Sequence, residues 1–595
     1  MDRKAITVVV VSVVLLVLWF PLVNKFYPPV PIEQRIGSNN QSTTNRTGTN
    51  IDGTNATVVK PPSVITNGTV AAIIAKPSAP EQTLILTNEW ARYTFTSHGG
   101  GLKQVELLKY PADVGCRTKE KEKQKDVAYA ALNTQALVPA LALTGAPELQ
   151  DKQPFALTTT TSGVRAEKTL TNGLKLVHEF VLGTNYQFAA TVRIENTTAA
   201  PLAVGALEWV LGTATPMSLR DDGLLMGLME SDGKNVQIVD QAWFANRTLG
   251  CFPGTPRQEF NSTGTNAAWG AVYNQFFTIT AVPQDPAPRL VAREVALPEP
   301  TAAEKVADPK AFPKPVGYQA AFGYTATVLK PGETLKHQLT VYAGPKEYNT
   351  LARLGLQEKQ ELDAVMNFGT WFGWVAKALL LSMNGLAAWG LPYGWAIVVI
   401  TIIIKLLFWP LTNASTKSMK RMAELQPQMK ALQEKYKDDS RKMNLKLMEF
   451  MKENKVSPLG GCLPMLLQIP VFFGFYTMLQ SAIELRGAEF FWVCDLSQPD
   501  TLASIGGFPI NPMPLLMGVT MIWQARLTPP SPGMDPMQQK IMKYMPLMFM
   551  VFLYNFSAGL TLYWTVQNLL TIAQMKITKV DPQVTKAVAT KAKKK

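Results

Sequence analysis

Lys405 is the residue that most constrains the fold of this chain, because it interrupts an otherwise unbroken apolar run over residues 395–409. No segment that could cross a membrane contains an aspartate or glutamate to neutralise it. A lone lysine at the centre of a membrane helix costs about 2.5–3.5 kcal/mol on insertion scales, so such residues usually face a bundle interior or a watery cavity. We therefore expect Lys405 to lie inside a helical bundle and to be solvated by water.

The composition is typical of a membrane protein with a large polar insertion. Of the 595 residues, 47% are hydrophobic and 17% are charged, and the longest apolar runs lie in the last third. A formal net charge of +14 is compatible with nucleic acid, acidic lipid or topology signals as the reason for the basic residues. Their position beside apolar runs favours membrane lipids and topology over DNA.

Residues 1–23 predict an uncleaved transmembrane anchor with its N-terminus in the cytoplasm. The apolar stretch 5–20 ends in bulky residues, whereas a signal peptidase needs small ones. Residues 24–80 are rich in Asn, Thr, Ser, Gly and Pro and offer little to bury. They predict a flexible linker in the periplasm.

Residues 81–348 predict a soluble all-β sandwich domain in the periplasm. Apolar Tyr186, Phe188 and Ala190 alternate with more polar neighbours, which is typical of half-buried antiparallel strands. The segment is long enough for a complete sandwich with Gly and Pro turns. Residues 349–390 predict interfacial helices on the periplasmic side, with tryptophans and a lysine as anchors: Trp371, Trp374, Trp389 and Lys377.

The sequence offers little chemistry, so we expect no enzyme activity, no metal site and no cofactor. The three histidines are far apart and lack Cys, Asp or Glu at ligand spacing. Cys116 and Cys251 either pair or remain free. Cys462 and Cys494 lack partners with which they could act as catalytic nucleophiles. No phosphate-binding glycine loop of the Gly-x-x-x-x-Gly-Lys-Ser/Thr type occurs.

Charge decides the topology of the last third. The segment 417–455 carries eleven lysines and arginines, and such a dense basic segment belongs in the cytoplasm. Residues 391–577 then form a core of five spans with a cytoplasmic helical hairpin at 413–454, and both chain termini lie in the cytoplasm. With the anchor, the six predicted spans are residues 5–20, 393–411, 463–482, 514–524 with an extension to 527 as the alternative, 541–556 and 559–575. Residues 578–595 form a basic cytoplasmic tail.

Polar residues in these spans recur at helical spacing. Thr401 lies one turn before Lys405, and Thr561, Thr565 and Asn568 follow each other at i, i+4 and i+7. Such stripes are compatible with ordinary hydrogen bonding between helices. Together with an unpaired lysine they favour a shared hydrated groove, lined by Lys405, Thr401, Gln468, Thr561, Thr565 and Asn568.

Several long motifs resemble one known family. They include NKVSPLGGCLPMLLQIPVFF at residues 454–473, ELR at 484–486 and DPMQQKIM at 535–542. FTSHGG at 95–100 and YAGPKEY at 342–348 extend the resemblance into the predicted β domain. In these motifs the chain resembles the YidC-type membrane protein insertases, in their Gram-negative form with a large periplasmic domain.

The resemblance implies an insertase and chaperone of the bacterial inner membrane that inserts, folds and helps to assemble membrane proteins, alone or with the Sec translocon. Its five-helix core would enclose a hydrophilic groove, and the groove cation of the family, commonly Arg, corresponds to Lys405. The implied partners are nascent inner-membrane proteins, lipids and the ribosome, the last through the basic tail. Apolar client segments would leave along the third and fifth spans, over Phe472, Phe473, Phe475, Met548, Phe549 and Phe552.

Other functions are compatible with parts of the sequence. A transporter or channel would use Lys405 as its selectivity charge, although mid-membrane carboxylates and repeated halves are not evident. An acyltransferase would need a nucleophile with a base, which the spans do not offer. A purely structural folding chaperone differs from an insertase only in whether the purified protein suffices for translocation.

Overall fold

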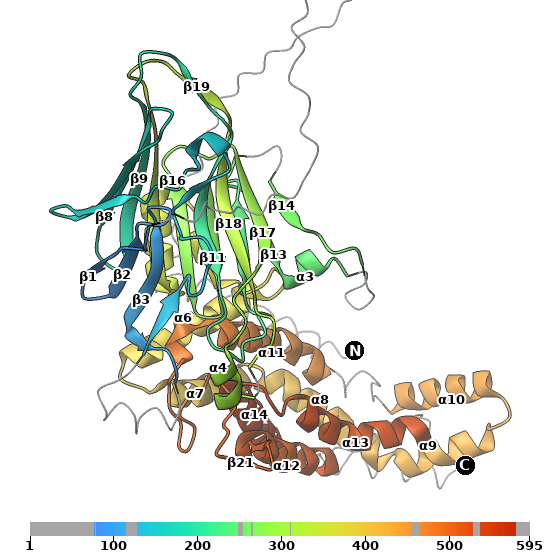
Figure 1. Cartoon of the computed structure of the whole chain (residues 1–595). Helices are drawn as coiled ribbons and strands as arrows, with labels where there is room; N and C mark the ends of the chain where they lie inside the picture. Colours follow the sequence, from blue (N-terminus) through green and yellow to red (C-terminus); the bar gives the residue numbers. More distant parts are fainter. Residues whose placement is uncertain are drawn as a thin grey trace, which may run out of the picture.

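The strands and the helices form two parts that are stacked on one another (Figure 1). The computed structural model describes residues 77, 79–114, 128–247, 254–262, 266–309, 311–454, 463–527 and 536–578. The predicted anchor, nearly all of the predicted linker and all but the first residue of the basic tail lie outside these residues. So do Cys116, Cys251 and Cys462.

Two large antiparallel sheets dominate the strand-rich part, which we call the β domain. Their strands are given in spatial order. The nine-stranded sheet contains β13 (Val236–Asp240), β12 (Gly227–Ser231), β15 (Trp269–Tyr273), β16 (Phe277–Pro283), β20 (Thr334–Pro345), β9 (Gln187–Asn196), β8 (Leu174–Leu182), β7 (Gly163–Thr169) and β6 (Ala156–Thr159). The five-stranded sheet contains β14 (Glu259–Asn261), β17 (Arg289–Ala296), β18 (Val316–Tyr324), β11 (Leu207–Ala214) and β5 (Leu143–Thr144).

Smaller sheets complete the β domain. A four-stranded sheet holds β1 (Thr83–Thr87), β2 (Ala91–Thr96), β3 (Leu102–Pro111) and β4 (Tyr129–Leu132), and β10 (Leu202–Val204) pairs with β19 (Thr327–Leu329). The short helices are η1 (Pro147–Leu149), α3 (Gln241–Ala245) and α4 (Ala302–Ala307). The β-rich fold predicted for this part of the chain is confirmed.

The two large sheets pack face to face. A Cβ atom added to Gly270 of β15 would lie 2.6 Å from Leu290 and 3.3 Å from Phe322, both on the five-stranded sheet. In the same way Gly212 of β11 lies against Ile279 of β16. Glycine at these positions lets the sheets approach closely, and inward side chains of both sheets form one continuous core.

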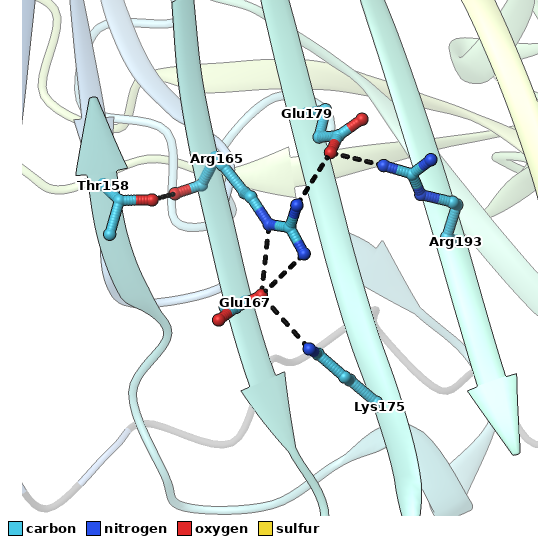
Figure 2. Close-up of polar contacts among 6 residues, drawn as sticks. All are labelled: Thr158, Arg165, Glu167, Lys175, Glu179 and Arg193. Carbon is cyan, nitrogen blue, oxygen red and sulfur yellow. Dashed lines mark hydrogen bonds and ion pairs between the residues drawn. The ribbon is translucent and has the colours of Figure 1, made fainter. Parts of the chain in front are cut away.

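The outward face of the nine-stranded sheet carries a ladder of alternating charge (Figure 2). Arg165 of β7 bonds Glu167 at 3.0 Å on its own strand and Glu179 of β8 at 3.3 Å. Glu179 also pairs with Arg193 of β9, and Lys175 lies 3.4 Å from Glu167. Opposite charges on neighbouring strands contribute modestly to stability, and they favour this strand register over a slipped one.

The helical part follows the β domain in the chain. A linker region holds α5 (Tyr348–Glu358), η2 (Leu362–Met366) and α6 (Gly373–Ala388). The remaining helices are α7 (Tyr393–Leu407), α8 (Trp409–Glu424), α9 (Gln426–Lys435), α10 (Ser440–Glu453), α11 (Leu463–Ser481), η4 (Ile483–Leu485), α12 (Pro512–Leu527), α13 (Pro536–Phe552) and α14 (Ala558–Ile577). A short hairpin of β21 (Ala503–Ile505) and β22 (Phe508–Ile510) precedes α12.

The predicted span 393–411 is not one straight helix, which corrects the sequence interpretation. It breaks at Phe408, and α7 and α8 meet at a bend of 66°. Pro410 sits in the first turn of α8, where it lacks an amide proton and its ring would clash with a continuing helix. Among the described residues, this bent pair passes a test of length and hydropathy for a membrane span and no single helix does.

Helices α9 and α10, which lie within the segment predicted as a helical hairpin at 413–454, project to one side of the helical part (Figure 1). Met422, Met429 and Leu447 are buried and form a small core of their own. Asp439 caps α10, because its carboxylate accepts a hydrogen bond of 3.0 Å from the amide of Lys442. Met422, Met429 and Leu447 are therefore accounted for by packing within this helical segment.

Helix α6 packs against α11. Val375 meets Gly474, and the ring of Phe372 stacks on Phe473 with centroids 5.9 Å apart. Trp371 and Trp389, at the two ends of α6, are among the most exposed large side chains of the described residues, as expected for interfacial anchors. Lys377, the predicted lysine anchor, is instead paired with an acidic side chain.

Lys377 does not point freely toward solvent. Its ammonium forms an ion pair of 3.2 Å with Asp363 and lies 4.9 Å from the ring centroid of Tyr348. Burial lowers the pKa of Lys377, but the charge of Asp363 and the contact with Tyr348 together outweigh burial, so the pKa is raised. Lys377 therefore connects α6 to η2 and α5, which precede it in the chain.

The segment after α11 fastens the helical part to the β domain. Arg486 donates hydrogen bonds to the carbonyls of Pro111 at 2.8 Å and Ala112 at 3.0 Å, at the end of β3. Its guanidinium also lies 5.6 Å from the ring centroid of Phe277 on β16. Arginine suits this position because one planar group can donate several bonds and still stack on an aromatic ring.

Glu484 is the acid buried beside this contact. Asn384 of α6 donates to one oxygen of Glu484 at 3.4 Å, while its other oxygen has no partner among the described residues. Tyr393 donates to Asn384 at 3.2 Å. Burial, and then the charge of Glu347, raise the pKa of Glu484 to about 7. The carboxyl is therefore held mainly as the neutral acid below neutral pH.

We predict that Glu484 makes the full-length protein less stable as the pH rises. An acid whose folded-state pKa exceeds its unfolded value of about 4.5 contributes stability below that value and loses it as the pH passes about 7. Glu484→Gln should therefore unfold at a higher temperature than the natural protein at pH 8, and the gap should close at pH 5. Glu434→Gln, at an exposed position, is the control. An equal gap at both pH values would contradict the prediction.

Candidate functional site

Lys405 is buried between α7 and α14. Only 6% of its surface is exposed, and its ammonium donates a hydrogen bond of 2.8 Å to the hydroxyl of Thr571. No carboxylate forms an ion pair with it in the described part of the chain. Thr401, one turn earlier on α7, is also buried, and its hydroxyl bonds the carbonyl of Ile397 at 2.6 Å.

Polar contacts continue from Lys405 along α14. Gln574 donates to Thr412 of α8 at 2.8 Å, and Lys420 donates to the carbonyl of Thr578 at 2.6 Å. Toward the opposite end of α14, the amide of Asn568 donates to Thr520 of α12 at 3.2 Å. We call these contacts, with Lys405 and Thr571, the polar seam. The seam joins α7, α8 and α12 to α14.

The structure brings together most of the predicted groove residues. Thr561, Thr565 and Asn568 are buried on α14, the helix that holds Lys405 through Thr571. Gln468 of α11 is half-buried and hydrogen-bonds Tyr563 of α14. Gln468 thus reaches the same helix, but no direct contact with Lys405 is among its bonds.

The sequence interpretation missed several members of the polar seam. Thr571 and Gln574 continue the stripe of Thr561, Thr565 and Asn568 by one further step each, so the same spacing would have found them. Thr412 lies beyond the helix break at Phe408, and Thr520 lies on the shortest predicted span. Neither belonged to a stripe that a single sequence could show.

The aromatic and methionine side chains predicted on α11 and α13 divide into exposed and buried groups. Phe473, Met548 and Phe552 are exposed. Trp564 of α14 joins the two helices, because Phe472 and Phe549 lie 4.9 and 5.8 Å from its ring centroid. An exposed apolar surface therefore does exist on α11 and α13.

Phe475 does not belong to that surface, so its assignment there is wrong. It has no exposed area, and its ring stacks on Tyr563 with centroids 4.3 Å apart. The helical period explains the difference, since Phe475 lies two residues beyond exposed Phe473 and therefore faces the opposite side of α11. Its role is to pack α11 against α14.

Metal and thiol chemistry find no support in the described residues. They hold no group of three or more His, Cys, Asp or Glu side chains that could bind a metal ion. Cys494 is disulfide-bonded. It is therefore unavailable as a free thiol.

Two family models together match most of the chain. Residues 85–381 match the YidC periplasmic domain, and residues 385–584 match the 60Kd inner membrane protein. The membrane protein insertase YidC of Syntrophus aciditrophicus is 31% identical over 594 residues, covering 96% of this chain and 98% of that protein. The chain belongs to the YidC family of membrane protein insertases. The chain is thus an inner-membrane protein with a periplasmic β-rich domain, and not an enzyme.

A second relative agrees with this assignment. A YidC insertase of a Geobacter species is 35% identical over 506 residues, covering 81% of this chain and 82% of that protein. A crystal structure of an active YidC insertase with its first transmembrane domain resolved aligns with 86% of this chain and 96% of that one. The identity there is 18% and the TM-score is 0.34.

We predict that the polar seam is reached by water from the cytoplasm, because one threonine hydroxyl alone cannot replace the hydration of a buried ammonium. Single cysteines at positions 401, 405, 468 and 565, in a background in which all four native cysteines are replaced, should react with a charged thiol reagent added on the cytoplasmic side. The same reagent added from the periplasm should react poorly.

A cysteine at position 475 is the matched control, because Phe475 is buried in apolar packing and should protect it from both sides. If positions 401, 405, 468 and 565 were all as inert as position 475, the polar seam and the predicted groove residues beside it would be dry.

Proposed function

We propose that this protein inserts nascent proteins into the inner membrane and helps them to fold and assemble, alone or with the Sec translocon, through a hydrophilic groove that contains Lys405. The observation that carries the proposal is a buried lysine whose one bond is to Thr571, within a seam of threonine, asparagine and glutamine side chains. Family membership supports it.

The groove would act by lowering the barrier that a client's polar flank meets. Polar groups that enter hydrocarbon without partners cost several kcal/mol each, so a half-depth polar groove shortens the dry part of the path. Lys405 has two N–H groups beyond the one that bonds Thr571, and these can hold acidic or carbonyl groups of the flank for a short time. No nucleotide is required, since transfer of the apolar span into lipid is favourable.

The apolar span of the client would leave over the exposed face of α11 and α13. Phe473, Met548 and Phe552 provide this face, and Phe472 and Phe549 support it through Trp564. Flexible methionine and planar aromatic side chains can accommodate client segments of different shapes. A transporter or channel would gain nothing from such a surface.

We predict that the charge at position 405 matters more than the identity of the cation. Lys405→Arg should retain insertion of a client with an acidic translocated flank. Lys405→Ala should reduce it roughly tenfold, because a hydrogen bond to a charged group contributes about 1.5–3 kcal/mol. Lys405→Glu should reduce it further. Protease protection of the client in vesicles that contain only the purified protein measures insertion.

Lys446→Ala is the control variant, since Lys446 is an exposed lysine of α10 that pairs with Glu449 at 2.7 Å. It should insert the client as the natural protein does. Full insertion by Lys405→Glu would overturn the electrostatic part of the proposal, and no insertion by the natural protein in these vesicles would favour a folding chaperone.

The basic tail gives a further partner prediction. Residues 576–595 contain seven lysines, which serve membrane topology and lipid binding or bind ribosomal RNA. Binding to RNA releases counterions, so the affinity should fall steeply with salt. Deleting the residues after Asp581 should lower co-sedimentation with ribosomes at low salt and have no effect at high salt. Equal binding with and without the tail at every salt concentration would limit the lysines to topology.

A further inference from the structure

A small polar cavity, partly open to solvent, lies where the β domain meets the helical part. Its volume is about 60 Å³. This is the volume open to the centre of a water-sized sphere, and one water molecule needs about 10–15 Å³ of it. The cavity therefore has room for a few waters or one small ion. Its lining comes from both parts of the molecule: Leu224, Leu225, Met226, Asp240, Tyr273, Gln275, Lys346, Asn367, Gln480 and Ser481.

Lys346 supplies the positive charge in this cavity. It follows β20 directly, is 2% exposed, and is held by a backbone hydrogen bond of 2.7 Å to Phe276. Its ammonium lies 5.0 Å from the ring centroid of Tyr273, and among the described residues no carboxylate pairs with it. The adjacent Glu347 instead accepts a bond of 2.6 Å from Thr350. Burial lowers the pKa of Lys346 to about 7.

The other polar groups of the lining are mostly hydrogen-bond donors. Burial, and then the charge of Asp240, raise the pKa of Tyr273, so its hydroxyl stays protonated. Gln275, Asn367, Gln480 and Ser481 add amide and hydroxyl donors. Asp240 is the one acid of the lining, and its carboxylate caps α3 by accepting from Trp243 at 3.0 Å.

We propose that this cavity binds one small monovalent anion, with chloride as the simplest case, as the counter-charge of Lys346. A buried ammonium without a partner is strongly unfavourable, and an anion among several donors removes that cost. The cavity is too small for a peptide or a lipid headgroup. The carboxylate of Asp240 opposes any anion in this cavity, and it opposes a divalent anion such as sulfate more strongly than a monovalent one.

The anion would also tie the two parts of the protein together. Tyr273 and Lys346 belong to the β domain, whereas Gln480 and Ser481 form the last turn of α11. One ion that accepts bonds from both sides would stabilise the junction next to the contact made by Arg486. This role is independent of client insertion, so either proposal can fail without the other.

The test compares the thermal unfolding of the full-length protein in chloride and in gluconate at equal ionic strength and pH 6.5. Gluconate has the same charge but is too large for the cavity. Chloride at ten times its dissociation constant should raise the unfolding temperature by about 3 °C. The difference should disappear in Lys346→Met, which keeps the length of the side chain. It should persist in Lys377→Met, because the charge of Lys377 is already met by Asp363.

Crystals soaked in bromide give a second readout that does not depend on the folding of a variant. An anomalous peak inside the cavity, within bonding distance of the Lys346 ammonium, supports the proposal. Bromide elsewhere with only water in the cavity overturns it, as does a chloride effect that is the same in Lys346→Met and in the natural protein.

Discussion

The cost of removing a lysine ammonium from water constrains the structure at two places. One is the polar seam around Lys405, and the other is the cavity around Lys346 at the junction of the β domain and the helical part. The desolvation penalty of an ammonium amounts to several kcal/mol in a real protein interior, and a carboxylate partner is the usual compensation. In the described part of the chain, Lys405 and Lys346 are both buried without such a partner. Neutral polar side chains contact Lys405, and the cavity of Lys346 is lined by neutral polar side chains and the carboxylate of Asp240. An ammonium in such a setting keeps its capacity to bind an anion from outside, which a lysine already paired with a carboxylate has lost.

The break between α7 and α8 makes this arrangement possible near Lys405. Because Pro410 ends the α7 direction, α8 turns by 66° and brings Thr412 and Lys420 to the last turns of α14. A straight helix would carry these groups further along the direction of α7, away from α14. Helices α9 and α10 then bury their own methionines. The position of the seam relative to the hairpin is therefore set by one proline.

The sequence predicted the features that have a local pattern. Strand alternation around Tyr186 and the threonine stripe of α14 are periodic, so the sequence predicts the β-rich domain and, of the polar seam, Lys405 and Asn568. The sequence did not predict the features that depend on contacts between distant segments. The ring of Phe475 stacks on Tyr563, and Arg486 donates to carbonyls at the end of β3. Lys346 lines a cavity together with the last turn of α11. No spacing within one segment encodes such pairs. The bend at Pro410 does not alter the hydropathy of the run, so hydropathy predicts one straight helix there.

The choice of lysine at position 405 suits a transient contact better than a fixed one. Arginine would present a planar fork that matches a carboxylate with two parallel bonds, which favours long residence of one ligand. Lysine presents three donors that rotate about one bond, and Thr571 holds only one of them. The remaining donors can pass from one carbonyl or carboxylate to the next without breaking a paired geometry. On the proposed function, a polar flank that must move through the groove would therefore be held loosely at this position, while the apolar face of α11 and α13 would guide the direction in which the client leaves.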